Sequence, residues 1–104
     1  MEDELIQRAR RYIELGDRYL GEGLPERAYE SYLDALRTLG ALLIYRDTGL
    51  LLPTNQLIDM LRSRYPEIYE IITRYERGNP ENAMALRREL EKLRGMMSLP
   101  SPDG

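Results

Sequence analysis

The sequence predicts an all-α protein, an up-down bundle of four to five helices that begins with a long antiparallel pair. Apolar residues recur at helical spacing along most of the chain, and no stretch of useful length alternates with a period of two. Valine is absent, whereas 18 of the 104 residues are leucine. A chain of this length has room for one domain, which we place at residues 1–95, followed by a flexible tail over residues 96–104.

A first helix is predicted from about Asp3 to Leu20. It has one stripe of apolar and small residues, which are Leu5, Ala9, Tyr12, Ile13, Gly16, Tyr19 and Leu20. The segment Gly21-Glu22-Gly23 follows, and glycine takes the left-handed backbone conformation that ends many helices without a steric penalty. We therefore expect the helix to end at this glycine pair.

A second helix is predicted from Pro25, whose missing N–H costs nothing in a first turn, to about Arg46. Its apolar face consists of Ala28, Tyr32, Ala35, Leu39, Leu42 and Leu43. Towards the end of the helix, Leu36, Gly40 and Ile44 make this surface broader. A helix that is apolar nearly all round is central or lies in an interface, so we expect this helix to form the core of the bundle.

The segment Asp47-Thr48-Gly49 interrupts the helical pattern, and an extended apolar connector, Leu50–Pro53, follows it. Either Thr54 or Asn55 is expected to cap a short third helix. This helix carries three apolar residues at helical spacing, which are Leu57, Ile58 and Leu61.

A fourth helix is predicted to start at Tyr65-Pro66 and to end near Arg77. The segment Gly78-Asn79-Pro80 then combines a helix stop with a new start, in which asparagine is the N-cap and proline takes the first helical position. The fifth helix is expected to run from Pro80 to Arg94, and Gly95 is expected to close it. Its buried residues are expected to be Ala83, Leu86, Leu90 and Leu93.

The residue types exclude several chemistries. Because cysteine and histidine are absent, the chain has no Cys/His zinc site, no thiol nucleophile, no Ser-His-Asp triad and no imidazole base. Two pairs of acidic residues, Glu26 with Glu30 and Glu67 with Glu70, each share a helix face, but these faces are expected to be exposed. We therefore predict a protein that is not an enzyme and that has no catalytic residue, metal or cofactor.

The sequence also indicates where the protein resides. The N-terminus is acidic and does not resemble a signal peptide, and no apolar stretch approaches the length of roughly 20 residues that a membrane span needs. We therefore expect a cytoplasmic protein with no membrane contact. Arginine makes up 14 of the 15 basic residues, a bias that fits either the ion-pair networks of a thermophile, which we favour, or a GC-rich genome.

Three arginines, Arg8, Arg11 and Arg18, lie on one flank of the first helix. They form either a patch for an anion or RNA, or a solvated surface of ion pairs with the nearby Glu4 and Glu14. The formal net charge of the chain is −3, so we favour the ion-pair surface.

The first two predicted helices resemble a single tetratricopeptide repeat. The residues that match its large, aromatic and small positions are Tyr12, Leu15-Gly16, Tyr19, Ala28, Tyr32 and Ala35. The pattern does not recur about 34 residues later, where Pro53 stands at the position that matches Tyr19. We therefore expect close packing of two helices without a repeat array. The resemblance implies an alternative function, an adaptor that binds a peptide between these two helices.

From about Leu5 to Leu93, the layout of the chain resembles a HEPN domain, and small archaeal and other prokaryotic HEPN proteins are similar in length. The matching stretches are AYESYLDAL at residues 28–36 and LPTNQL at residues 52–57. Many HEPN sequences have a histidine where this chain has Asn55, and the nuclease members carry an Arg-x4–6-His signature. Because this chain has no histidine, we do not carry the ribonuclease activity over to it.

The HEPN resemblance implies a helical bundle that forms a homodimer and contacts a nucleotide, RNA or a nucleotidyltransferase partner. It places functional groups beside the loop after the second helix, where the candidate ligand or RNA contacts are Arg46, Asp47, Thr54 and Asn55. A third possibility is a degraded ribonuclease whose residual activity depends on Arg46. In a homodimer, the apolar segment Leu39–Tyr45 is expected to be covered by the second copy, and the candidate interface residues are Tyr29, Gly40, Ile44 and Tyr45.

Overall fold

The helix α2 (Pro25–Thr48) lies at the centre of the molecule, as its apolar pattern predicts, and 12 of its residues are buried. The computed structural model describes residues 1–97. Within that range it contains five helices and no strand, which confirms the predicted all-α fold class. The other four helices are α1 (Glu2–Gly21), α3 (Thr54–Arg64), α4 (Pro66–Glu76) and α5 (Ala83–Met96).

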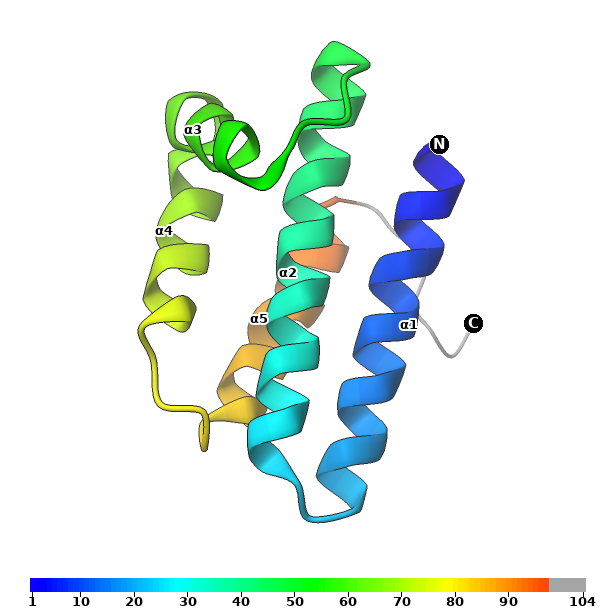
Figure 1. Ribbon diagram of the computed structural model, residues 1–104, viewed down its shortest axis with the longest axis vertical. Coiled ribbons are helices and arrows are strands. Elements are labelled where there is room, and N and C mark those ends of the chain that lie inside the picture. Colours follow the sequence, from blue (N-terminus) through cyan, green and yellow to red (C-terminus); the bar gives the residue numbers. More distant parts are fainter. Residues whose placement is uncertain (98–104) are drawn as a thin grey trace.

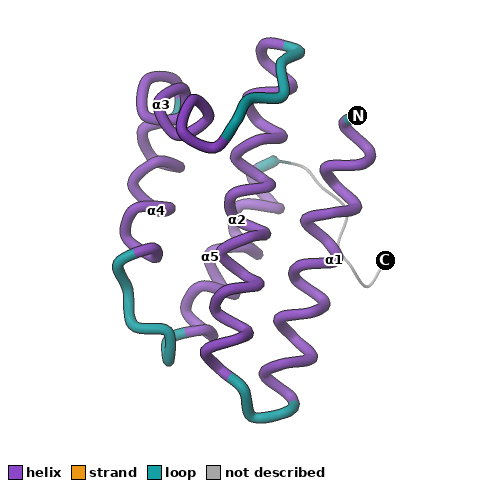
Figure 2. Tube along the Cα trace, viewed as in Figure 1, coloured by secondary structure: helices purple, strands orange, loops and turns teal. Residues whose placement is uncertain are grey.

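The chain runs up and down the long axis of the bundle (Figure 1). α1 lies antiparallel beside α2, and the end of α2 extends beyond it, which confirms the predicted long pair. α3 lies across the end at which α2 stops, α4 returns beside α2, and α5 lies behind α2 in this view. Figure 2 shows the loops that join these helices. Of the described helices, none combines the length and the apolar character that crossing a membrane requires.

The close approach of α1 to α2 depends on Gly16. A Cβ atom at this position would lie 2.4 to 2.9 Å from three carbons of the Tyr32 ring, which is far inside a normal contact. Tyr32 is completely buried, and its hydroxyl donates a hydrogen bond of 2.5 Å to Asp17 Oδ1 on α1. The predicted reason for the glycine, close packing of an antiparallel helix pair, is therefore confirmed.

Two helix ends follow the predicted glycine chemistry with small shifts. Gly49 adopts a left-handed conformation with φ of 72° and ends α2 after Thr48, two residues beyond the predicted end. After α1, the glycine with positive φ is Gly23, at 76°, while Gly21 is still helical. A third end is different, because the N-cap of α3 is Pro53, which makes no side-chain capping bond. The Asn55 side chain, one residue inside the helix, accepts a hydrogen bond of 3.0 Å from the Gln56 N–H.

The predicted start of the fifth helix at Pro80 is wrong. The Asn79 side chain accepts a hydrogen bond from the Glu81 N–H at 3.0 Å, and the Asn79 carbonyl accepts one from the Asn82 N–H at 2.9 Å. These two bonds form a turn, so Asn79 stabilises a loop and does not act as the expected N-cap. α5 therefore begins three residues later, at Ala83.

The fifth helix ends two residues later than predicted, at Met96 and not at Arg94. Gly95 lies inside α5, which continues to Met96. Met97 is only 8% exposed and packs with the core, and its carbonyl accepts a hydrogen bond from Arg46 Nη1 at 3.3 Å. Burial of Met97 therefore extends the folded part to at least this residue. The rest of the predicted tail, residues 98–104, lies outside the described residues.

Candidate functional site

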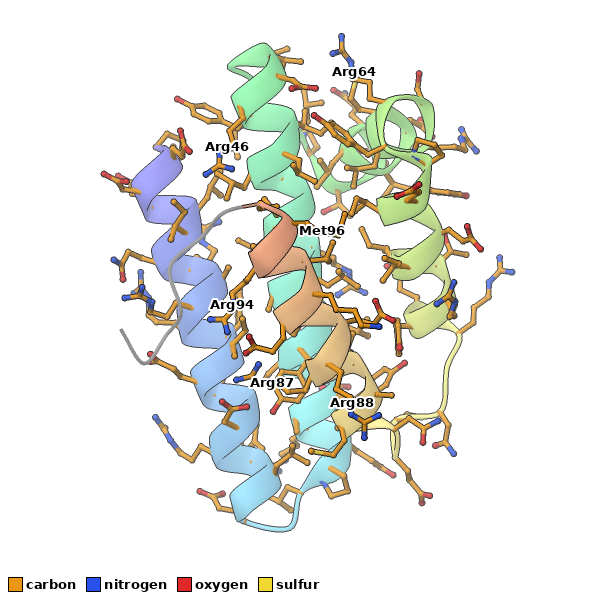
Figure 3. All side chains as sticks on the ribbon, turned by 180° about the vertical axis from the view of Figure 1, so that it is seen from behind. Arg46, Arg64, Arg87, Arg88, Arg94 and Met96 are labelled. Carbon is orange, nitrogen blue, oxygen red and sulfur yellow. The ribbon has the colours of Figure 1, made fainter. Side chains whose placement is uncertain are left out.

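An open cavity of about 340 Å³ lies where the start of α4 meets the C-terminal end of α5. Its apolar walls come from three helices and the residue after α5, and consist of Leu43, Ile68, Leu93, Met96 and Met97. The corner between α3 and α4 completes it with Arg64, Tyr65, Pro66 and Glu67. We refer to this feature as the end cavity. Figure 3, seen from behind, shows Met96 beside it, on the side of α5 that faces α4.

Met96 differs from the other apolar residues of the end cavity in its exposure. Its side chain is 70% exposed, the largest fraction among the exposed large apolar residues of the described chain, whereas Leu93 and Met97 are buried in the wall. An apolar side chain in water next to an apolar hollow is an arrangement that burial by another molecule would stabilise.

The rim of the end cavity carries charges of both signs. Arg64 Nη1 lies 3.6 Å from Asp47 Oδ2, to which the Tyr65 hydroxyl donates a hydrogen bond of 2.6 Å. This hydrogen bond to the carboxylate, together with partial burial, raises the pKa of Tyr65. Glu67 is exposed and forms no ion pair within residues 1–97. The site therefore combines an apolar floor with one cationic and one anionic rim group.

The structure does not bring the four predicted ligand or RNA contacts together around this cavity. Arg46 turns towards α1 and α5, where its Nε lies 2.6 Å from Glu2 Oε1. Asp47 turns the other way and contacts the α3–α4 corner. Thr54 and Asn55 are exposed at the start of α3, and none of the four residues lines the end cavity. In this structure Arg46 and Asp47 tie helices together, so they have a structural role there.

Three of the four predicted interface residues are buried inside one chain, which corrects that prediction. Tyr29 is 3% exposed, and its hydroxyl donates a hydrogen bond to the Tyr75 carbonyl of α4. Gly40 packs against Leu61 of α3, and Ile44 is completely buried. These residues lie against the chain's own α3 and α4, because both helices fold back onto α2. Tyr45 alone keeps part of its surface exposed.

The predicted ion-pair surface on the first helix is not formed. Within residues 1–97, no ion pair involves Arg8, Arg11 or Arg18. Arg8 and Arg11 line a shallow hollow together with Tyr12. The same part of the chain contains no group of three or more acidic side chains placed to hold a metal ion.

Sequence reasoning missed a network of polar groups that joins α1, α2 and α5. Asp17 accepts hydrogen bonds from Tyr32 and from Arg87 Nε, the latter at 2.9 Å. Glu91 accepts hydrogen bonds from Arg87 and from Arg94. Figure 3 shows Arg87 and Arg94 extending from α5 towards α1. Burial and the bond to Asp17 raise the pKa of Tyr32. The Arg87–Glu91 and Glu91–Arg94 pairs have the spacing of neighbours on one helix. The bond from Arg87 to Asp17 joins residues 70 positions apart, and no local pattern marks it.

The network predicts a pH effect. The hydrogen bond from Arg94 to Glu91, aided by Arg87, lowers the pKa of Glu91 from 4.5 to about 2. A carboxylate with a lowered folded pKa stabilises the fold fully above the unfolded pKa, and this stabilisation disappears as the pH falls through the folded pKa. Because Glu91 is 48% exposed, solvent screening limits the effect to about 1 kcal/mol.

We therefore expect Glu91→Gln to lose about 1 kcal/mol of unfolding free energy at pH 7, and we expect this difference to become much smaller as the pH falls to 2. Urea unfolding followed by circular dichroism at several pH values measures the difference. Glu14→Gln is the control, because Glu14 is exposed and forms no ion pair within residues 1–97. An equal loss at pH 7 and at pH 2 would contradict the assignment to Glu91.

The fold and the site define this chain as an all-α helical bundle with an open apolar cavity where α4 begins and α5 ends. Comparison with protein-family models, with curated proteins and with solved structures finds no match to the chain. The HEPN and tetratricopeptide resemblances therefore stay predictions that depend on the sequence stretches given above.

Proposed function

We propose that this chain is a non-catalytic binding module that acts as a homodimer. The observation that supports this most is the end cavity, whose apolar walls and exposed Met96 stay in contact with water in a single copy. Removal of apolar surface from water is the main driving force for protein association. The lining offers an apolar floor for a side chain, and its polar groups lie at the rim, which suits a protein surface better than a polar substrate.

The HEPN resemblance supports the same proposal and extends it. Its implications include a homodimer and a contact with a nucleotide, RNA or a nucleotidyltransferase partner. For that second contact we propose the start of α3, where Thr54 and Asn55 are exposed. Arg46 and Asp47 are less suited, since both already pair with other residues of the same chain.

The alternative is the adaptor that the tetratricopeptide resemblance implies. In the structure the Tyr32 ring fills the space beside Gly16, between α1 and α2. A peptide bound between these helices would have to displace that buried side chain. We therefore favour the homodimer.

Sedimentation equilibrium over a range of micromolar concentrations tests the proposal. We expect a species with twice the chain mass of 12.2 kDa, in equilibrium with the single chain. A strict monomer at high micromolar concentration would contradict the homodimer. A chain that stays monomeric but retains a peptide, and loses it on Tyr19→Ala, would favour the adaptor instead.

A further inference from the structure

We infer that the end cavity receives Met96 of the partner subunit, so that two copies of this chain join through the C-terminal ends of their α5 helices. This inference rests on the proposed homodimer, and adds to it a surface, an occupant and a central residue. Three features of the end cavity support it, namely its space, its arrangement next to Met96 and its rim charges.

The space fits a methionine side chain. A dry apolar cavity of about 150 Å³ holds a benzene molecule, so the end cavity, at about 340 Å³, has room for one unbranched side chain with space left for adjustment. Methionine is suited to an irregular apolar hollow, because its three rotatable bonds and polarisable sulfur adapt to the walls.

The position of Met96 satisfies the geometry of a symmetric dimer. In a two-fold interface the same patch is used on both subunits, so the patch must be complementary to itself. Met96 is a projecting side chain at the edge of the hollow that would receive its equivalent. A two-fold axis close to Met96 therefore places each methionine in the other subunit's end cavity. The same rotation fills both cavities.

The charges on the rim fit a second copy of the chain. Arg64 and Glu67 stand on the same rim and have opposite signs. A two-fold axis that passes Met96 and runs between these two residues places each cation opposite an anion of the other subunit, because residues on either side of such an axis face one another across the interface. A partner surface of one sign would instead face a like charge at one of the two positions.

Substitution of Met96 tests the interface. We expect Met96→Glu to weaken dimerisation at least about a hundredfold in sedimentation equilibrium, because the carboxylate would enter an apolar cavity without a partner. Met84→Glu is the matched control. Met84 is also an exposed methionine of α5, at 55%, but it lies at the opposite end of the helix, and its variant should dimerise like the original protein.

The rim gives a second, independent variant. Glu67→Arg should weaken dimerisation several-fold, because it would place two cations opposite one another, and adding Arg64→Glu should restore part of the loss. Circular dichroism checks that all variants keep the helical fold, which we expect since these side chains are largely exposed.

The outcomes separate the inference from the proposed function. If the original protein is a dimer and Met96→Glu dimerises equally well, the interface lies elsewhere and the inference is wrong while the proposed homodimer stands. If Met84→Glu dissociates as strongly as Met96→Glu, the inference is also wrong, because the effect is then not local to the cavity. If the original protein is monomeric, both proposals fail, and the end cavity serves another occupant.

Discussion

Replacing Tyr32 with alanine is expected to lower the free energy of unfolding by about 3–5 kcal/mol. The ring is completely buried between α1 and α2, and its hydroxyl bonds to Asp17, so the change removes a large apolar side chain and a polar contact together. The surrounding core relaxes only in part after such a change, so a cavity remains and adds to the loss. Urea unfolding at pH 7, followed by circular dichroism, measures the loss.

A second substitution at the same position separates the two contributions. Tyr32→Phe keeps the ring and removes only the hydroxyl, so we expect it to cost about 1 kcal/mol. Asp17 keeps its ion pair with Arg87 in this variant. A loss for Tyr32→Ala that is no larger than the loss for Tyr32→Phe would show that the ring does not hold the helix pair together.

Replacing Gly16 with valine is expected to cost about 3 kcal/mol or more, at the upper end of what overpacking usually costs. The new side chain would begin at a Cβ position 2.4 Å from the Tyr32 ring, and the ring has no free space into which to retreat. The two helices must therefore separate, which also weakens the contacts around them. Thermal and urea unfolding measure this change.

Gly95→Val is the control for this prediction. Gly95 also lies inside a helix, but a Cβ atom there meets nothing within 4 Å. Since valine is a somewhat better helix former than glycine, this variant should be as stable as the original protein or slightly more stable. Similar losses at both positions would indicate that the substitution acts through the helix backbone and not through the α1–α2 contact.

The sequence predicts those parts of the fold best that depend on a single local property of the chain. The period of apolar residues gave the helices, and glycines with positive φ at positions 23 and 49 gave two of the boundaries. The glycine and proline signals around residue 80 were less reliable, because Asn79 uses its side chain for a turn that competes with a helix cap.

The candidate site was harder to predict. The apolar pattern of α2 indicates that its surface must be covered but does not indicate by what, and the structure shows that α3 and α4 cover Gly40 and Tyr29. The end cavity depends on the distance between the start of α4 and the end of α5, which are separated by many residues in sequence. Met96 is an apolar residue after the last buried leucine of α5 and is the one local signal of this site, although it falls within the predicted tail.

Contacts between subunits test the central claim most directly. Equimolar chains are mixed, one uniformly labelled with 13C and one without label, and isotope-filtered nuclear Overhauser spectra record only contacts between a labelled and an unlabelled chain. Contacts from the Met96 methyl group to methyl groups of Leu43, Ile68 or Leu93 in the unlabelled chain are the predicted result. A dimer whose filtered spectrum contains no contact from the Met96 methyl group to the other chain would contradict the claim.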